Sequence, residues 1–223
     1  MGPEVDVYKV GGESLESFLK SPPRGRYILV HGAGKEISRI MEKRGLKPRY
    51  IGGQRCTDEK TLEVVSAVMD MTRRKIMDVF GTRAVAVRGD EFGFLAKKIN
   101  KLGLVGDVYD YPDKLLLELV KKRILVISPL AKTVKGETLN INADLFAQAL
   151  VSKLPVRRLV FYSDVTGVHD GNGRLIRRIT GKEVRSLIAG GTINAGMIPK
   201  VLSALRARNR GARMVQIGKT VIE

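Results

Sequence analysis

The feature of this sequence that most constrains its fold is the alternation of strand-like and helix-like segments along the whole chain. Short runs rich in Val, Ile and Leu recur between longer segments whose apolar residues are spaced as in a helix. This pattern favours a sheet of parallel strands covered by helices on both faces. We therefore expect an α/β fold, a three-layer αβα sandwich around a mainly parallel open sheet. With 223 residues, the chain can bury a substantial core.

The expected elements follow from these patterns. Strands are expected at residues 5–10, 27–30, 84–87, 124–127, 159–162 and 214–217. Helices are expected at residues 14–19, 35–44, 57–80, 115–122, 143–154 and 197–208, and one more begins at the capping-box pair Thr180 and Glu183. An apolar stripe along the longest helix consists of Leu62, Val65, Met69, Thr72, Ile76 and Val79. No clean linker interrupts the pattern, so two lobes would share one continuous sheet.

Composition excludes several classes of protein. Cys56 is the single cysteine, and His31 and His169 are the two histidines, so neither a disulfide framework nor a Cys/His zinc site fits one chain. No apolar stretch approaches the roughly 18 residues that a membrane-spanning helix needs. No signal peptide precedes the first expected strand. We expect a soluble cytoplasmic protein with no membrane partner.

The formal net charge of +17 is unusual for a chain of this length. Such a surplus attracts phosphates, nucleic acid or an acidic protein, although solvated helix faces explain most surface charge. Aromatic residues make up 5% of the chain and do not alternate with the basic groups. Stacking platforms for bases are therefore missing, which argues against nucleic acid as a partner.

Three glycine-containing turns follow expected strands, at residues 9–12, 31–34 and 164–167. In open α/β sheets, ligands bind at this carboxyl edge of the strands, where glycine lets backbone N–H groups approach phosphate or carboxylate oxygens. Each turn alone is more often only a tight turn. Neither a Walker A loop nor a Rossmann glycine fingerprint occurs. Phosphate would have to be bound in another way.

Four side chains could supply that binding. Lys9 and Lys200 each adjoin a glycine-containing turn, and lysines stabilise the charge of a phosphoryl-transfer transition state. Asp144, at the start of its helix, could orient such lysines, and Arg55 could grip a carboxylate. Taken singly, these residues could equally be surface lysines, a helix-capping acid and a surface arginine. Cys56 fits a small buried filler better than a nucleophile.

Six motifs occur in order along the chain. They are Lys-Val-Gly-Gly at 9–12, His-Gly-Ala-Gly at 31–34, Gly-Gln-Arg-Cys-Thr-Asp at 53–58 running into Glu-Val-Val at 63–65, Asn-Ile-Asn-Ala-Asp at 140–144, Ser-Asp-Val-Thr-Gly at 163–167, and Gly-Met-Ile-Pro-Lys at 196–200. In this order, over residues 9 to 200, they resemble the acetylglutamate kinases of arginine biosynthesis, within the amino-acid-kinase superfamily. The fourth and sixth motifs are specific, whereas the glycine turns are not.

The resemblance implies the amino-acid-kinase fold and a transfer of phosphoryl from ATP to the side-chain carboxylate of N-acetylglutamate. The product would be an acyl phosphate, and Mg2+ would be held mainly by ATP, with no metal ligand from the protein. Residues 1–223 would form one domain. Its N-terminal lobe, to about residue 130, would bind the acid, and its C-terminal lobe, from about 131, would bind the nucleotide.

The resemblance also assigns roles to residues. Lys9 and Lys200 would stabilise the transferring group, and Asp144 would hold both lysines. The acid substrate would be bound by Gly32, Ala33, Gly34, Arg55 and Asn140. ATP would be bound by Gly11, Gly12, Asp164, Thr166, Gly167, His169, Thr192 and Asn194.

Some features depart from the family pattern. Ala33 replaces the middle residue of a glycine triplet and would be strained at positive φ. The middle segment, residues 88–113, is shorter than in the family pattern. Residues 218–223 leave no room for the final helix of that pattern. Without the N-terminal helix associated with arginine-inhibited hexamers, a homodimer is the simpler expectation.

Alternative functions remain open. The nearest is a kinase for glutamate or aminoadipate linked to an acidic amino-group carrier protein, which the net charge favours. The motifs at 53–58 and 140–144 favour the free acid. Another kinase of the superfamily, or a basic binding module that lost catalysis, are further alternatives.

Overall fold

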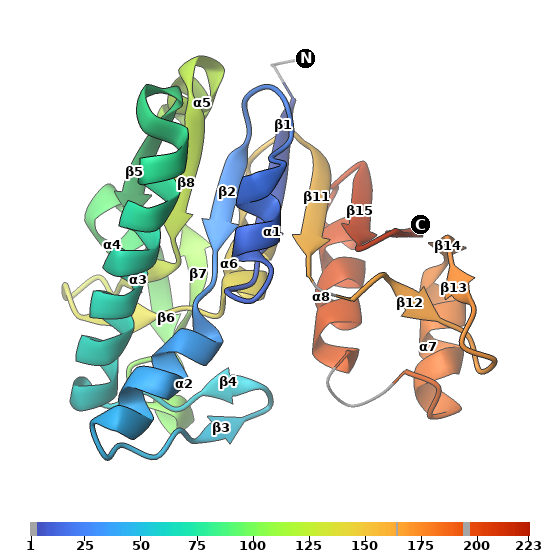
Figure 1. Ribbon diagram of the computed structural model, residues 1–223, viewed down its shortest axis with the longest axis horizontal. Helices are drawn as coiled ribbons and strands as arrows, with labels where there is room; N and C mark the ends of the chain where they lie inside the picture. Colours follow the sequence, from blue (N-terminus) through green and yellow to red (C-terminus); the bar gives the residue numbers. More distant parts are fainter. Residues whose placement is uncertain (1–3, 164, 194–196) are drawn as a thin grey trace.

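The computed structural model describes residues 4–163, 165–193 and 197–223. Its main sheet has eight strands in the order β14-β16-β15-β11-β1-β2-β8-β5 (Figure 1). In chain order these are β1 (Val5–Val10), β2 (Ile28–His31), β5 (Ala84–Arg88), β8 (Ile124–Ser128), β11 (Val156–Tyr162), β14 (Arg178–Ile179), β15 (Met214–Ile217) and β16 (Thr220–Ile222). Neighbouring strands are parallel except β15 and β16, which pair antiparallel. Strands from before and after residue 130 therefore belong to one sheet.

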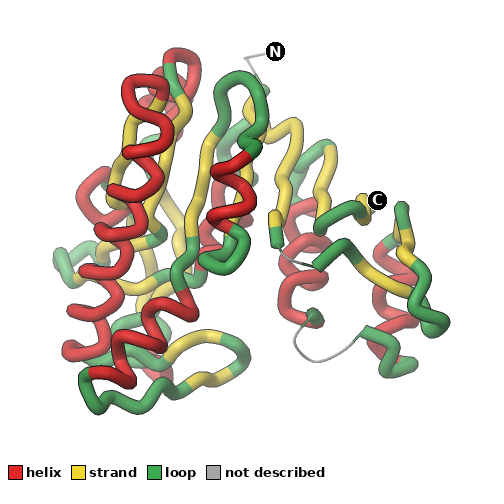
Figure 2. Tube along the Cα trace, in the orientation of Figure 1, coloured by secondary structure: helices red, strands yellow, loops and turns green. Residues whose placement is uncertain are grey.

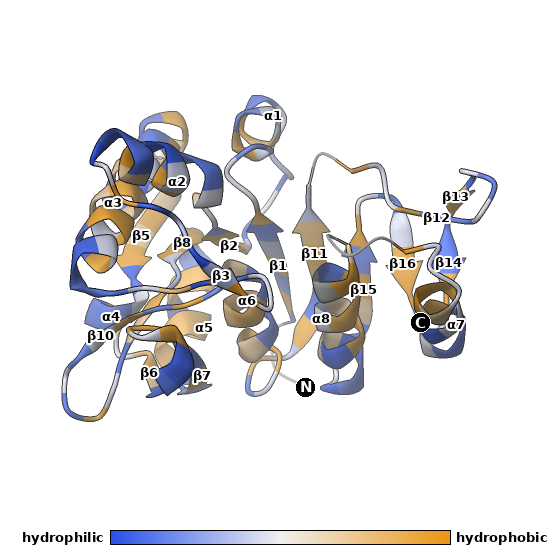
Figure 3. Cartoon of the chain, turned by 90° about the horizontal axis from the view of Figure 1, so that it is seen from below, coloured by the Kyte–Doolittle hydropathy of each residue, from blue (hydrophilic) through white to orange (hydrophobic). Residues whose placement is uncertain are grey.

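Helices cover both faces of this sheet (Figure 3). One layer contains α1 (Leu15–Lys20), α2 (Gly34–Lys43) and α3 (Glu59–Phe80). The other contains α5 (Asp113–Lys122), α6 (Ala143–Leu150) and α8 (Ile198–Asn209). A short α4 (Gly89–Phe92) follows β5, and α7 (Gly181–Ala189) lies near β14. The expected three-layer αβα architecture is confirmed. Within the described part of the chain, no helix combines the length and the apolar character needed to cross a bilayer.

Smaller sheets lie beside the main one. Four strands pair in the order β10-β9-β6-β7, formed by β6 (Leu95–Lys98), β7 (Gly106–Asp110), β9 (Leu130–Lys132) and β10 (Thr138–Asn140). Two hairpins join β3 (Tyr50–Ile51) to β4 (Gln54–Arg55) and β12 (Val168–His169) to β13 (Leu175–Ile176). Single 3-10 turns occupy Gly81–Arg83 and Asn100–Leu102. Figure 2 shows how the helices run alongside the strands.

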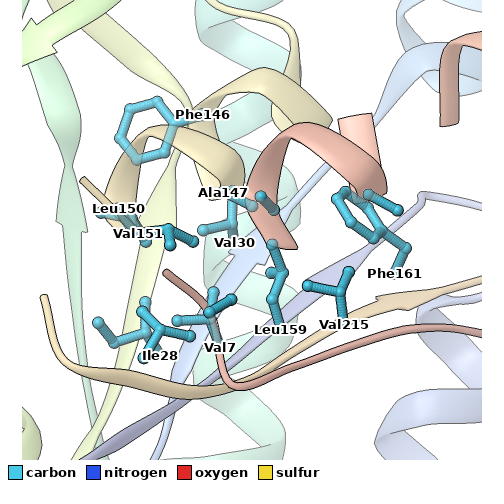
Figure 4. Close-up of a cluster of buried hydrophobic side chains, with 14 of the residues drawn as sticks. Val7, Ile28, Val30, Phe146, Ala147, Leu150, Val151, Leu159, Phe161 and Val215 are labelled. Atoms are coloured by element: carbon cyan, nitrogen blue, oxygen red, sulfur yellow. The ribbon is translucent and has the colours of Figure 1, made fainter. Parts of the chain in front are cut away.

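The central strands are buried on both faces, which explains their nearly continuous apolar sequence. Along β1, Val5 and Val7 face one core, whereas Tyr8 and Val10 face the other. Figure 4 shows part of the first core, where side chains of α6 lie over β1, β2, β11 and β15. This core fixes the position of α6 against β1. The start of α6 therefore lies close to the carboxyl end of β1.

Two expectations about helices are wrong in detail. The helix expected at 143–154 ends at Leu150, because bonds from Val151 and Ser152 to carbonyls three residues back tighten the chain into a turn before Pro155. The stripe expected on α3 is rotated: Val64 and Val68 are buried, whereas Val79 is 44% exposed.

The capping box at the start of α7 is as expected, and a hairpin turn joins β9 to β10. Both capping bonds of Thr180 and Glu183 are present, and Gly136 has φ +86° between the paired strands.

Candidate active site

The loops after β1 and β2 meet at the carboxyl edge of the main sheet. The backbone N–H of Gly32 donates to the Val10 carbonyl at 2.8 Å. A Cβ at Gly12 would lie 3.2 Å from the Ala33 Cα and 3.3 Å from the Gly32 oxygen, so glycine allows this close approach without displacing the second loop. Ala33 has φ −143°, so the strain that a positive φ would cause at this position does not occur.

A pocket of about 200 Å³ opens at this edge. Its walls come from the two glycine loops, the β3–β4 hairpin, the end of β10 and the start of α6. Seven expected site residues lie in this wall together with Gly11 and Gly12: Lys9, Gly32, Ala33, Gly34, Arg55, Asn140 and Asp144. In Figure 1 the hairpin and α2 lie beyond the arrowhead of β2.

Lys9 and Asp144 form an ion pair in the floor of the pocket. The Lys9 Nζ lies 2.7 Å from the Asp144 Oδ1, and the two side chains are 12% and 20% exposed. The contact lacks the angles of an aligned hydrogen bond, so it is a close charge pair. Asn142 caps α6 by accepting from the backbone N–H of Asp144 at 2.9 Å. The helix N-terminus further favours a carboxylate at this position.

Arg55 is held rigidly in the opposite wall. Its Nη2 donates to the Gly34 carbonyl at 2.8 Å and to the Ser38 Oγ at 2.9 Å. Its guanidinium lies 4.9 Å from the centre of the Tyr50 ring. Burial lowers the pKa of Arg55 from its usual value, partly offset by Tyr50. The guanidinium remains a cation at the edge of the pocket.

Asn140, at the end of β10, is linked to the Arg55 loop through Thr57. The Asn140 Nδ2 donates to the Thr57 Oγ1 at 3.1 Å. The Thr57 Oγ1 in turn donates to the Arg55 carbonyl at 3.0 Å. Thr57 is 1% exposed, and its place in the motif at 53–58 indicated no contact with Asn140. Thr57 and Asn140 are 83 positions apart in the sequence, so the only sequence signal for Thr57 was its position next to the Arg55 segment.

His31 is a second residue whose surroundings the sequence did not reveal. It ends β2, directly before Gly32, and is fully buried. Its Nε2 lies 2.9 Å from the Ser128 Oγ at the end of β8. Burial, and then the positive charge of Arg73, lower the pKa of His31 to about 3, opposed by Asp70. The imidazole is therefore neutral and ties the ends of two strands together beneath the Gly32–Ala33 loop.

Gly11 and Gly12, two of the residues expected to bind ATP, line the pocket around Lys9, whereas the others that the structure describes are distributed over the other half of the edge. The Thr166 Oγ1 lies 3.1 Å from the His169 Nε2, and the Thr166 carbonyl accepts from the Lys219 N–H at 2.7 Å. A Cβ at Gly167 would lie 2.5 Å from the Thr220 Oγ1, so this glycine allows the β12 loop to pack on β16. Thr192 follows α7, where its N–H donates to the Leu187 carbonyl. The residues of that half do not line the pocket around Lys9.

Lys200 lies in the first turn of α8, which packs against α6, the helix that carries Asp144. The fourth and sixth motifs, which contain Asp144 and Lys200, thus end on two helices that pack against each other (Figure 1). Asp164 and Asn194, also expected at the nucleotide site, lie outside the described residues.

The described residues do not form a ready metal site. No group of three or more His, Cys, Asp and Glu side chains comes together in residues 4–163, 165–193 and 197–223. The carboxylate of Asp144 faces the ammonium of Lys9.

Comparisons with known proteins agree with this geometry. The sequence profile of the amino acid kinase family matches residues 7–219. The acetylglutamate kinase of Aquifex aeolicus is 33% identical over 96% of this chain and 84% of its own length. That of Sinorhizobium medicae is 39% identical over 86% of this chain and 73% of its own. A solved structure of a Streptococcus mutans protein superposes with a TM-score of 0.81 at 26% identity, covering 98% of both chains. The chain therefore belongs to the acetylglutamate kinase family, a branch of the amino acid kinase family.

Proposed function

We propose that this enzyme transfers the γ-phosphoryl group of ATP to the side-chain carboxylate of N-acetylglutamate and releases an acyl phosphate and ADP. The Lys9–Asp144 pair carries the proposal, because it fixes an ammonium group in the floor of a pocket walled by Arg55 and Asn140. Two cationic side chains on one small pocket suit a substrate with two carboxylates. The family of the chain supports the same chemistry.

In the proposed reaction a carboxylate oxygen attacks the γ-phosphorus, and the bond from that phosphorus to the β–γ bridging oxygen breaks. The carboxylate is already ionised near pH 7, so no general base is required. Catalysis then depends on alignment and on neutralising charge over the transferring group. Lys9 and Lys200 supply that charge, and Asp144 holds Lys9 in place. Magnesium bound to ATP would offset further phosphate charge.

The remaining residues divide between the two substrates. Arg55, Asn140 and the backbone at Gly32, Ala33 and Gly34 would bind the acid. The nucleotide would be bound by Gly11, Gly12, Asp164, Thr166, Gly167, His169, Thr192 and Asn194. Apart from Asn140, the residues proposed for the acid lie in the lobe up to about residue 130, and apart from Gly11 and Gly12, those proposed for ATP lie in the lobe from about 131.

The test is ATP turnover with N-acetylglutamate, with hydroxylamine trapping of the acyl phosphate. Lys9→Ala and Lys200→Ala should each lower kcat by at least about a hundredfold, the scale of one lost transition-state contact. Nucleotide binding, measured by calorimetry, should largely survive. Lys101→Ala, on an exposed turn, is the control. Wild-type kcat in both variants would remove these lysines from the mechanism.

A second substrate class is favoured by the charge of the chain. Residues 151–223 contain fourteen Lys or Arg against four Asp or Glu, a surface that would attract an acidic carrier protein bearing glutamate or aminoadipate. Turnover with such a carrier and none with the free acid would select this alternative. ATP binding without turnover of any acid would indicate a non-catalytic module.

We also expect a homodimer that works in the cytoplasm, where ATP is available. Light scattering after size-exclusion chromatography tests the dimer, and the mass of a single chain would contradict it.

A further inference from the structure

Thr57 connects the two residues proposed to hold the acid substrate. It lies at the entrance to α3 and is almost completely buried, so no water replaces its contacts. One oxygen, the Thr57 Oγ1, is within hydrogen-bond distance of both the Asn140 side chain and the Arg55 carbonyl. This hydroxyl is not exposed to ligand itself. Thr57 can therefore influence a bound ligand only by positioning the residues that it contacts, Arg55 and Asn140.

The backbone around Thr57 is fixed on both sides. Its N–H donates to the Leu102 carbonyl at 2.9 Å, and its carbonyl accepts from the Leu104 N–H at 2.6 Å. The Leu104 carbonyl in turn accepts from the Asn140 N–H at 2.9 Å. Gly103, at φ +79°, makes this approach possible, because a Cβ there would lie 2.4 Å from the Thr57 oxygen. The hydroxyl therefore cannot shift away from Asn140 without moving β10.

The single hydrogen of the hydroxyl decides the orientation of Asn140. Because Thr57 donates it to the Arg55 carbonyl, its oxygen can act toward Asn140 only as an acceptor. Asn140 must then turn its NH2 group toward Thr57, as the 3.1 Å contact shows. Asn140 also lines the pocket. Its carbonyl oxygen Oδ1 is consequently the atom left to accept a hydrogen bond from a ligand.

We propose that Thr57 is a positioning residue that sets the direction of the Asn140 carboxamide and so makes the pocket select an acid with a neutral N–H group beside its carboxylate. The inference rests on the proposed function. A protonated amine would also offer N–H, but it would stand near the cationic groups of Lys9 and Arg55. An acylated amine supplies the N–H without the charge. The proposal thus predicts a preference for the amide over both the free amine and an ester.

The experiment compares Thr57→Val, which keeps the shape and loses the hydroxyl, with Thr57→Ser, which keeps the hydroxyl. Each is assayed with N-acetylglutamate and with its ester analogue, 2-acetoxyglutarate, in which oxygen replaces N–H. In the wild-type enzyme the KM for the ester should exceed that for the amide by at least about tenfold, since a site built around a hydrogen bond rejects an analogue that lacks it. T57V should reduce this ratio toward one with kcat and the KM for ATP little changed. T57S should restore it.

The outcomes separate the inference from the function. If the wild-type enzyme does not phosphorylate N-acetylglutamate, the proposed substrate and the N–H role of Asn140 are both overturned. If it does, and T57V keeps the wild-type ratio, the role of Thr57 alone is overturned. Melting temperatures accompany each assay. Thr57→Ala, which also removes the hydroxyl but introduces no new contact, replaces T57V if that variant fails to fold.

Discussion

At the scale of single residues, the surroundings of His31 connect stability to the site. The imidazole forms a hydrogen bond with Ser128, and His31 directly precedes the loop at residues 32–34 that forms part of the pocket wall. Its pKa is about 3 in the folded protein, below the ordinary value of 6.5, because the charged form would be buried. The unfolded chain therefore binds more protons than the folded chain between these two pH values. Stability is fully present above about pH 6.5 and falls as the pH drops toward 3.

His31→Gln should alter this pH dependence. We expect the variant to be less stable than the wild-type protein at pH 7.5 and to lose less on acidification, because the wild-type slope attributable to His31 approaches about 1.4 kcal/mol per pH unit. Urea unfolding at pH 7.5, 5.5 and 4.5 measures both quantities. Ser128→Ala is the matched control, since it keeps the buried imidazole and should keep the wild-type slope. Equal slopes in the wild-type protein and H31Q would show that other groups govern acid stability.

At the scale of elements, the β3–β4 hairpin is attached to α2 through Arg55. Besides Gly34 and Ser38, the guanidinium contacts the ring of Tyr50, whose hydroxyl lies 2.9 Å from the Ser38 Oγ. A two-stranded hairpin of this length is marginal by itself. Its position over the pocket therefore depends on this cluster.

Arg55→Lys should separate the hairpin from α2. An ammonium group cannot donate to two acceptors in a plane and stack on an aromatic ring together. We expect the KM for the acid substrate to rise by about tenfold, the equivalent of one lost charged contact, while the KM for ATP stays near the wild-type value. Arg49→Lys, on the exposed approach to the same hairpin, is the control. An unchanged acid KM in R55K would reject the substrate-binding role of Arg55.

The same hairpin shows where prediction from sequence ends. Strands β1, β2 and β8 were predictable because burial on both faces gives nearly continuous apolar runs. The strands of the hairpin have two residues each and exposed or polar side chains, so no periodicity marks them. Gly52 and Gly53, with φ +57° and +76°, were a usable signal, since paired glycines at positive φ form tight hairpin turns.

For the site, the motif residues were predictable from the sequence, but the residues that they contact were not. Motif order pointed to Lys9, Arg55, Asn140 and Asp144, and the structure brings these four side chains to one pocket. Their partners were not predictable, because Thr57 and Asn140 are 83 residues apart and His31 and Ser128 are 97 apart. Such contacts depend on the register between strands, which local sequence patterns do not specify.

At the scale of the whole molecule, charge is distributed unevenly. The whole chain has 40 Lys and Arg against 23 Asp and Glu, and much of the surplus falls in residues 151–223. Parts of it are neutralised locally, as where Arg157 and Arg158 both bond to Asp6 across β1 and β11. Burial alone would raise the pKa of Asp6, but the hydrogen bonds and charges of Arg157 and Arg158 outweigh it, so the pKa is lowered. The rest gives a net positive charge, and hence a positive potential, to the part of the chain proposed to receive most of the nucleotide.

This potential should make ATP capture sensitive to salt. Attraction between the positive lobe and the anionic phosphates acts over distances comparable to the Debye length, about 10 Å at 0.1 M ionic strength, so added salt weakens approach more than it weakens direct contacts. We expect kcat/KM for ATP to fall several-fold between about 0.02 and 0.3 M ionic strength, with kcat changed by less than about twofold. Parallel titrations with potassium chloride and potassium glutamate separate screening from competition by one anion. A constant kcat/KM for ATP across this range would mean that the surplus charge is too distant from the nucleotide to steer it, and would leave an acidic protein partner as the better explanation of the basic lobe.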